Sequence, residues 1–331
     1  MSYPTPSQAL VTEWQSVVDA IQNHCVADHA LVRMAYPNSF DVLVATAGES
    51  KELQAGSSVH RDGSHYCDDV LNNRVPLCVA DANESAHWDG VTERRAGWMS
   101  YCGAPLLWPD EEAFGTLALL SRTPLPSERA AQHLQLISCL GRGMNAQLAL
   151  LYREQQSAYE ASHDNVTGLF NAVKFKEFAT AQIEGKRNSD QGLWLLLWSI
   201  DGLADLKRKE LKKTAEEDPL STLLRAMAER ARGCVRQTDI LARLDNNQFA
   251  MLIPEANEFI AASIGDRIQR AIRRLGADLG TSSPITLSCG VACYQENESY
   301  DGWRSRCFAA TQNAEAVGGN QLIAARETAL Q

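Results

Sequence analysis

The sequence predicts an α+β protein with two domains, each built on a mostly antiparallel sheet, and a long helix between them. Two observations lead to this prediction. A chain of 331 residues is long enough for two ordinary domains. Along it, short apolar runs bounded by turn residues alternate with stretches that carry apolar residues at helical spacing. We expect a first domain over residues 1–126, a connecting helix over 127–162 and a second domain over 163–331.

Composition is typical of a globular protein, and we expect a cytoplasmic one. Apolar residues make up 45% of the chain and charged residues 22%. The net charge of −10 argues against a nucleic-acid partner, because phosphate binding needs a basic face. The chain begins with a polar stretch that has no secretory signal. The most apolar run, Leu193–Trp198, is far shorter than the roughly 20 residues that span a bilayer, so no membrane segment is expected. The nine cysteines have no framework spacing, and we expect all of them to be reduced thiols.

The first domain is expected to begin with a helix and to continue as a sheet. Apolar residues recur at helical spacing over residues 8–26. Turn residues such as Pro37-Asn38-Ser39 separate the runs that follow. The expected elements are strands at Ala30–Tyr36 and Phe40–Ala47, a short helix near Tyr66–Asn72, and strands at Leu77–Ala80, Ser100–Leu107 and Phe114–Ser121.

Four ordered fragments of this half resemble the GAF domain family. They are Tyr66-Cys67-x-x-Val70, Pro76-Leu77-x-Val79-x-Asp81-Ala82, Ser100-Tyr101-x-Gly103-x-Pro105-Leu106-x-Trp108-Pro109 and Phe114-Gly115-Thr116-Leu117. The resemblance covers about residues 1–150. It implies an antiparallel-sheet sensor domain with helices on the faces of the sheet and an unknown small molecule as ligand.

The GAF resemblance also implies a set of residues around the ligand cavity. These are Tyr66, Cys67, Trp98, Tyr101 and Cys102. The two cysteines are expected to act as small buried apolar groups. His60, His65 and Cys67 lack the paired spacing of a zinc site, so no metal is expected.

The connecting helix raises the question of a dimer. Ser127 offers an N-cap, and the apolar residues Ile137, Leu140, Met144 and Leu151 follow coiled-coil spacing, with Gln147 in the remaining position. For residues 144–160 we expect a homodimer, because no other surface is evident for this stripe to cover. The alternative for the first half is that the stripe packs on the sheet of its own domain.

The second domain opens with His163-Asp164-Asn165-Val166-Thr167-Gly168-Leu169-Phe170-Asn171, which resembles the Asp-x-Leu-Thr-Gly-Leu-x-Asn opening of GGDEF domains, the diguanylate cyclases. Ser288-Cys289-Gly290-Val291-Ala292 and the hairpin at 243–254 extend the resemblance over residues 163–325. It implies a nucleotidyl-cyclase-like α/β domain with a central, mostly antiparallel sheet. The expected elements are helices at Val173–Gly185, Leu220–Val235, Glu258–Leu275 and Trp303–Val317, strands at Leu193–Ile200 and Ile285–Ala292, and the hairpin Ile240–Ile253.

The cyclase signature itself is altered. An active member of the family joins two GTP molecules to form cyclic di-GMP, using divalent metal held by carboxylates. Here the signature reads Asp245-Asn246-Asn247-Gln248-Phe249, so both glycines and both acids of the family pattern are replaced. Ser199 stands where the family has its other metal-binding acid, and of that motif only Asp201 remains.

The cationic phosphate contacts of the family are also replaced. Ala204 and Glu315 stand where the family has lysines, and Gly319 stands where it has an arginine. A basic run, Lys207-Arg208-Lys209 with Lys212-Lys213, is expected to be a solvated helix face. We therefore expect no catalytic residues and no cofactor, with Mg²⁺ bound only if residual cyclase activity exists.

One binding motif of the family is retained. Arg236 and Asp239 match the Arg-x-x-Asp pattern that binds cyclic di-GMP in related domains, and Arg267 matches the helper arginine on the following helix. The resemblance thus implies a cytoplasmic signalling protein in which a GAF sensor is coupled to a GGDEF domain that binds cyclic di-GMP or another protein. Two alternatives stay open: a residual or atypical diguanylate cyclase, and a nucleotide-free scaffold that pairs with an active cyclase.

Overall fold

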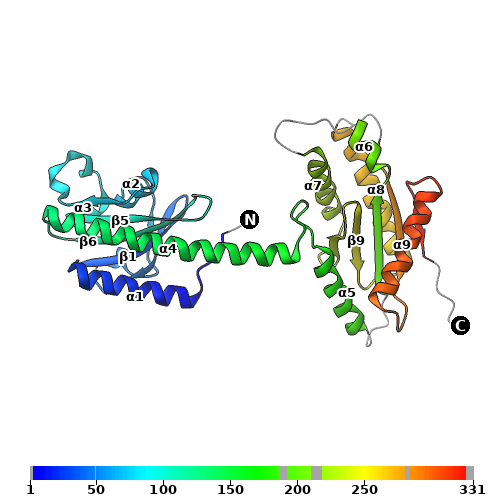
Figure 1. Ribbon diagram of the computed structural model, residues 1–331, viewed down its shortest axis with the longest axis horizontal. Coiled ribbons are helices and arrows are strands. Elements are labelled where there is room, and N and C mark those ends of the chain that lie inside the picture. The colour runs from blue at the N-terminus through cyan, green and yellow to red at the C-terminus, as the bar shows by residue number, and fades with distance from the viewer. Residues whose placement is uncertain (1–2, 49, 187–191, 210–217, 280–283, 326–331) are drawn as a thin grey trace. The chain divides into compact units, whose positions relative to one another are not determined.

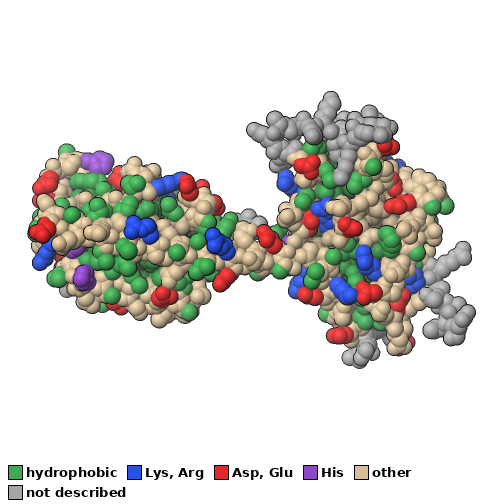
Figure 2. Space-filling model, in the orientation of Figure 1, with side chains coloured by type: hydrophobic (Ala, Val, Ile, Leu, Met, Phe, Trp, Pro, Cys, Tyr) green, Lys and Arg blue, Asp and Glu red, His purple; other side chains and the backbone are tan. Residues whose placement is uncertain are grey.

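The computed structural model describes residues 3–48, 50–186, 192–209, 218–279 and 284–325 (Figure 1). The chain forms two compact units, residues 1–156 and 157–331, and the division falls within the long helix α4 (Ser127–Ser162). On the face shown in Figure 2, acidic and basic side chains are interspersed over both units. No helix within the described ranges is long and apolar enough to cross a membrane.

The first unit is a six-stranded sheet in the order β3-β2-β1-β6-β5-β4, and every neighbouring pair of strands is antiparallel. One face packs against α1 and α4, and the other face packs against α2 and the segment around α3. Its elements are α1 (Gln8–Cys25), β1 (His29–Ala35), β2 (Ser39–Ala45), β3 (Ser58–His60), α2 (Tyr66–Asn73), β4 (Leu77–Val79), α3 (Thr92–Arg95), β5 (Ser100–Leu107) and β6 (Ala113–Ser121), with short 3₁₀ turns at Lys51–Leu53, Ala82–Glu84 and Ala86–Trp88.

The apolar stripe of α4 packs on its own domain. Ile137, Met144 and Leu148 are buried in the core between α4, α1 and the sheet. Gln147, assigned to the seam of a coiled coil, instead accepts a hydrogen bond of 2.6 Å from the Trp14 indole of α1. We expected that residues from 144 onward would find no surface of their own domain to pack on. For residues 144–152 this expectation is wrong, because the helix packs on this core as far as Tyr152. A homodimer stays a prediction.

The second unit is a five-stranded sheet in the order β11-β10-β7-β9-β8, in which only the β10–β11 pair is parallel. Helices α7 and α8 cover one face, and α5 and α9 cover the other. Its elements are α5 (Ala172–Lys186), β7 (Trp194–Ile200), α6 (Leu203–Lys209), α7 (Pro219–Arg232), β8 (Ile240–Arg243), β9 (Gln248–Ile253), α8 (Glu258–Asp278), β10 (Leu287–Cys293), α9 (Tyr300–Ala316) and β11 (Leu322–Ala324).

Four of the described helices and strands were not predicted: β3, α3, α6 and β11. The strands have three residues each, too few for a period of two to be seen. Helix α6 contains the start of the basic run, whose side chains lie outside the described residues.

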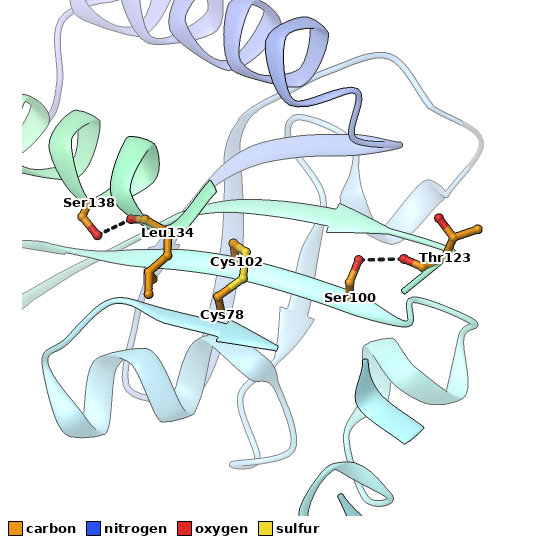
Figure 3. Close-up of a disulfide and its surroundings, with 6 residues drawn as sticks. All are labelled: Cys78, Ser100, Cys102, Thr123, Leu134 and Ser138. Atoms are coloured by element: carbon orange, nitrogen blue, oxygen red, sulfur yellow. Dashed lines mark hydrogen bonds between the residues drawn. A yellow bond between two sulfur atoms is a disulfide. The ribbon is translucent and has the colours of Figure 1, made fainter. Parts of the chain in front are cut away.

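The expectation that all nine cysteines are reduced is corrected by the structure. Cys78 and Cys102 form a disulfide between β4 and β5, and the other seven cysteines are thiols (Figure 3). The two residues face each other directly in the antiparallel pairing of these strands, with their Cα atoms 4.1 Å apart. Because 24 positions separate them in the sequence, only the sheet register brings the sulfur atoms together.

Candidate functional site

The altered signature lies at the tip of the β8–β9 hairpin, beside the end of β7. The Asn247 amide forms two hydrogen bonds with the backbone of Ile200: its Oδ1 accepts from the amide nitrogen at 2.9 Å, and its Nδ2 donates to the carbonyl oxygen at 3.2 Å. A residue at a position where the family has an acid thus joins two strands here. Gln248 accepts a hydrogen bond of 3.0 Å from Arg304, and Phe249 is stacked on Trp198 in the core. Asn246 donates its backbone N–H to the carboxylate of Asp245 at 2.6 Å.

Both acids beside this hairpin already have partners. Glu315 of α9 accepts a hydrogen bond from the Ser199 hydroxyl of β7. Asp201 accepts hydrogen bonds from the Ser288 hydroxyl at 2.6 Å and from the backbone N–H of Asn320 at 2.8 Å. The Asp201 carboxylate therefore fastens the end of β7 to β10 and to the turn after α9.

These residues surround an open cleft of about 540 Å³. Its described lining residues are Ile200, Asp201, Gly202, Leu203, Ala204, Asn247, Glu315, Gly318 and Gly319. Two of them carry carboxylates and none carries a cation, so the described lining has a net negative charge. Across the described ranges there is no group of three or more His, Cys, Asp and Glu side chains that could hold a metal ion.

The Arg-x-x-Asp motif forms a closed turn between α7 and β8. Asp239 accepts the backbone N–H of Arg236 at 2.8 Å through Oδ2, and its own N–H donates to the Arg236 carbonyl at 3.2 Å. The other carboxylate oxygen, Oδ1, is shielded from solvent and has no hydrogen-bond partner. Arg267 of α8 donates to the carbonyl of Cys234, two residues before Arg236. The structure thus brings together the three predicted binding residues, with both arginines exposed.

A partly buried ion pair that the sequence analysis did not single out holds the signature hairpin. Arg243 contacts both carboxylate oxygens of Asp164, at 3.1 and 3.2 Å, and donates to the carbonyls of Asp245 and Asn246. Burial alone would raise the pKa of Asp164, but hydrogen bonds from Thr167 and the charge of Arg243 lower it below its ordinary value. The pair ties the hairpin to the opening motif of the domain.

In the first unit, the structure brings together four of the five predicted cavity residues. Tyr66, Cys67, Trp98 and Tyr101 are buried on the face of the sheet covered by α2. Cys102 belongs to the opposite face, because successive side chains of a strand alternate, and it forms the disulfide there.

The centre of this cavity region is a buried polar cluster. Arg33 of β1 and Glu93 of α3 form an ion pair of 2.6 Å, with side chains only 3% and 5% exposed. His65 Nδ1 lies 2.9 Å from the same Glu93 oxygen, and its Nε2 lies 3.0 Å from the carbonyl of His60. Cys67 is buried in the apolar cluster of this face, as expected, and Arg33 also contacts its sulfur. The available sequence signal was an arginine inside the apolar run of β1.

Two atoms of the cluster remain without partners. These are Arg33 Nε and Glu93 Oε2, both of which are buried. Both residues line a void of about 10 Å³, together with residues that include Leu53, His65 and Trp98. A void of this volume holds about one water molecule.

The cluster predicts how the stability of the first domain depends on pH. Burial opposes the charge of Glu93, but contacts with His65 and Arg33 have the larger effect and lower the pKa of Glu93 from 4.5 to about 2. The stabilising contribution of the Glu93 carboxylate is therefore complete above pH 4.5 and is lost as the pH falls toward 2. Burial also opposes the charge of His65, but Glu93 raises its pKa above 6.5, so that contribution is complete below pH 6.5 and is lost at higher pH. We expect this cluster to stabilise the domain most between pH 4.5 and pH 6.5.

Hydrogen exchange of β1 and β6 peptides as a function of pH measures this effect. Glu93→Gln should remove the loss of stability at acid pH, and an unchanged loss at acid pH would contradict the assignment.

Comparison with known families gives the architecture. The GAF domain model matches residues 10–148, and the model described as "Diguanylate cyclase, GGDEF domain" matches residues 161–321. Among curated relatives, diguanylate cyclase DgcM of Escherichia coli (strain K12) is 26% identical over 191 residues, which cover 58% of this chain and 44% of the relative. Diguanylate cyclase TpbB of Pseudomonas aeruginosa is 29% identical over 171 residues, which cover 49% of this chain and 38% of the relative. The chain thus spans less than half the length of these relatives.

A solved structure, the GGDEF domain of DgcB from Caulobacter crescentus in complex with c-di-GMP, matches with a TM-score of 0.45 at 19% identity and covers 50% of this chain and 97% of that one. The two family matches lie one after the other along the chain, in the order that the sequence motifs indicated. The chain belongs to the proteins in which a GAF domain is followed by a GGDEF domain.

Proposed function

We propose that this chain is a cyclic di-GMP receptor whose GGDEF domain has lost the diguanylate cyclase reaction, with the GAF domain as the sensory input. The relatives named as diguanylate cyclases support a place in cyclic di-GMP signalling. The receptor function rests on the turn that carries Arg236 and Asp239, and the loss of catalysis rests on the cleft beside the signature hairpin.

The contacts in the cleft support the loss of catalysis. Asn247 is held to the backbone of Ile200, and Ser199 is bonded to Glu315, so these positions offer neutral or already bonded groups. A Mg²⁺ ion beside a triphosphate is held by charged oxygen ligands, and an amide oxygen supplies no charge to balance it. An acid at position 315 also adds repulsion where phosphates would lie.

The unpartnered oxygen of Asp239 is the observation that carries the receptor function. A shielded carboxylate oxygen without a donor leaves an acceptor site unfilled, and the N1–H and N2–H groups of guanine are suitable donors. Arg236 and Arg267 lie on the same turn and on the adjoining helix, where guanidinium groups can bond to the guanine edge and to phosphates.

Isothermal titration of the full chain with cyclic di-GMP tests the proposal. We expect binding, and we expect Asp239→Ala or Arg236→Ala to weaken it about tenfold to a hundredfold, the loss of one hydrogen bond to a charged group. Arg270→Ala is the matched control, because Arg270 is an exposed arginine one turn further along α8 and should leave the affinity unchanged. Absence of heat at high micromolar ligand would rule out the receptor.

Incubation with GTP and Mg²⁺ tests the second half of the proposal. We expect no cyclic di-GMP above background. Product formation by the chain alone would instead support a residual or atypical cyclase. If the protein neither makes nor binds the dinucleotide, the remaining alternative is a scaffold that pairs with an active cyclase.

A further inference from the structure

A small pocket between α1 and α4 gathers basic side chains. It has a volume of about 200 Å³ and lies where the last turn of α1 meets the first turns of α4. His24 comes from α1, whereas Arg129, Gln132 and His133 come from α4. None of the described lining residues is acidic, although the whole chain carries a net charge of −10. The lining is therefore cationic in a chain that is otherwise anionic.

His133 is the observation that points to a ligand. Its side chain is only 7% exposed, yet neither ring nitrogen has a hydrogen-bond partner among the described residues. Buried polar groups are nearly always hydrogen-bonded, to protein or to an ordered ligand or water. A buried imidazole on the wall of a pocket, without a partner in the protein, leaves its ring nitrogens available to an occupant of that pocket.

The charges around His133 determine what kind of occupant fits. Burial, then the charges of Arg129 and His24, lower the pKa of His133 below its ordinary value of 6.5. An anion in the pocket would oppose both charge effects. The C-terminal end of α1 and the N-terminal end of α4 meet here, so their helix dipoles offset each other and the side chains decide the sign of the site.

Size limits the occupant to a small group. A volume of about 200 Å³ is below the range of about 300–1,000 Å³ that is usual for pockets that hold drug-sized ligands. A tetrahedral oxyanion is small enough and carries several acceptors. The guanidinium of Arg129 can donate two parallel hydrogen bonds to it, and the Gln132 amide and the two imidazoles can donate others.

We propose that this pocket binds a single phosphate group, held by Arg129, Gln132 and His133 of α4 and by His24 of α1. The ligand is free phosphate or the phosphate end of a small metabolite. Both helices pack on the same face of the sheet, so the bound anion joins the end of α1 to the start of α4 (Figure 1). The inference goes beyond the proposed function, because the turn that carries Arg236 and Asp239 belongs to the other unit.

Titration of the full chain with inorganic phosphate tests the inference. Sodium chloride holds the ionic strength constant, and the imidazole NMR resonances of His133 report the binding. We expect a saturable shift of these resonances with phosphate and none with chloride alone. Methyl phosphate in a parallel titration distinguishes the two sources: binding of both anions indicates the phosphate end of a metabolite, and binding of inorganic phosphate alone indicates free phosphate.

Arg129→Gln separates a built site from general attraction of anions. We expect it to weaken phosphate binding about tenfold to a hundredfold, as for the loss of a hydrogen bond between charged groups. The side chain of Arg129 is exposed, so the variant should fold. Arg142→Gln is the matched control: Arg142 is exposed on the same helix, does not line the pocket and carries the same charge, so its loss should leave the affinity unchanged.

Protonation of His133 gives a second readout. Sulfate has the shape of phosphate, and its charge stays constant over the pH range in which histidine titrates. Saturating sulfate should raise the pKa of His133 by about one unit, which corresponds to a tenfold preference for the charged imidazole. The charged groups that face His133 are Arg129 on its own helix and His24 on α1.

Three outcomes would overturn the inference. The first is a His133 shift in phosphate that does not saturate or does not exceed the shift in chloride. The second is equal phosphate affinity of the Arg129→Gln and Arg142→Gln variants. The third is an unchanged pKa of His133 in saturating sulfate.

Discussion

Replacement of Arg33 by methionine is expected to destabilise the GAF domain by about 3–5 kcal/mol, because it removes the guanidinium from the buried Glu93 carboxylate and leaves His65 as its partner. The side chains of Arg33 and Glu93 are 3% and 5% exposed, so bulk solvent does not reach the carboxylate to replace the lost contact. Methionine preserves much of the volume of arginine, and the loss therefore reports on charge more than on packing. Hydrogen exchange of β1 and β6 peptides in the full chain measures the effect, and β7 and β10 peptides of the other domain provide the reference.

Two further variants separate the ion pair from other causes. Arg33→Met combined with Glu93→Gln removes both charges and should recover a large part of the loss. Arg74→Met breaks the exposed pair between Arg74 and Glu111, whose side chains are 49% and 75% exposed, and should cost less than about 1 kcal/mol. If Arg33→Met costs no more than Arg74→Met, the buried pair does not have the role that its geometry indicates.

The extent to which sequence could predict the fold depends on the length of each repeating pattern. Helix α8 and strand β7 were predicted close to their observed bounds, because each carries a sustained apolar pattern. Strand β11 is defined by its parallel pairing with β10, and its three residues show no pattern of their own. The stripe on α4 was visible, but its partner was not, since a heptad-like spacing fits a domain core as well as a coiled coil.

The same limit applies to the sites. The altered signature and the Arg-x-x-Asp motif are local in sequence and could be recognised there. The ion pair between Arg33 and Glu93 joins residues 60 positions apart, and hydrogen-bond donors from three different strands contact the Cys67 sulfur. No local pattern encodes such contacts, because they depend on strand register and on the packing of α2 and α3 against the sheet. The one available sign was a charged residue in a strand whose neighbours are apolar on both sides.

Gly290→Ala is expected to destabilise the GGDEF domain by about 3 kcal/mol, because there is no space for a methyl group between β10 and α9. A Cβ atom at this position would lie 2.4 Å from the carbonyl oxygen of Cys307 and 2.6 Å from the backbone nitrogen of Thr311. Both atoms belong to the backbone of α9, so no side-chain rotation can relieve the overlap. Hydrogen exchange of β10 and α9 peptides should show the loss, with β1 peptides of the GAF domain unchanged.

Gly185→Ala is the control in the same domain. Gly185 lies near the end of α5, and a Cβ atom there would have no neighbour within 4 Å, so alanine should leave stability equal or slightly higher. Equal stability of the Gly290→Ala and Gly185→Ala variants would mean that α9 does not approach β10 as closely as the structure has it. A large difference would give a physical reason for the glycine of the Ser-Cys-Gly-Val-Ala motif: it lets α9, which carries Glu315, pack directly on the sheet.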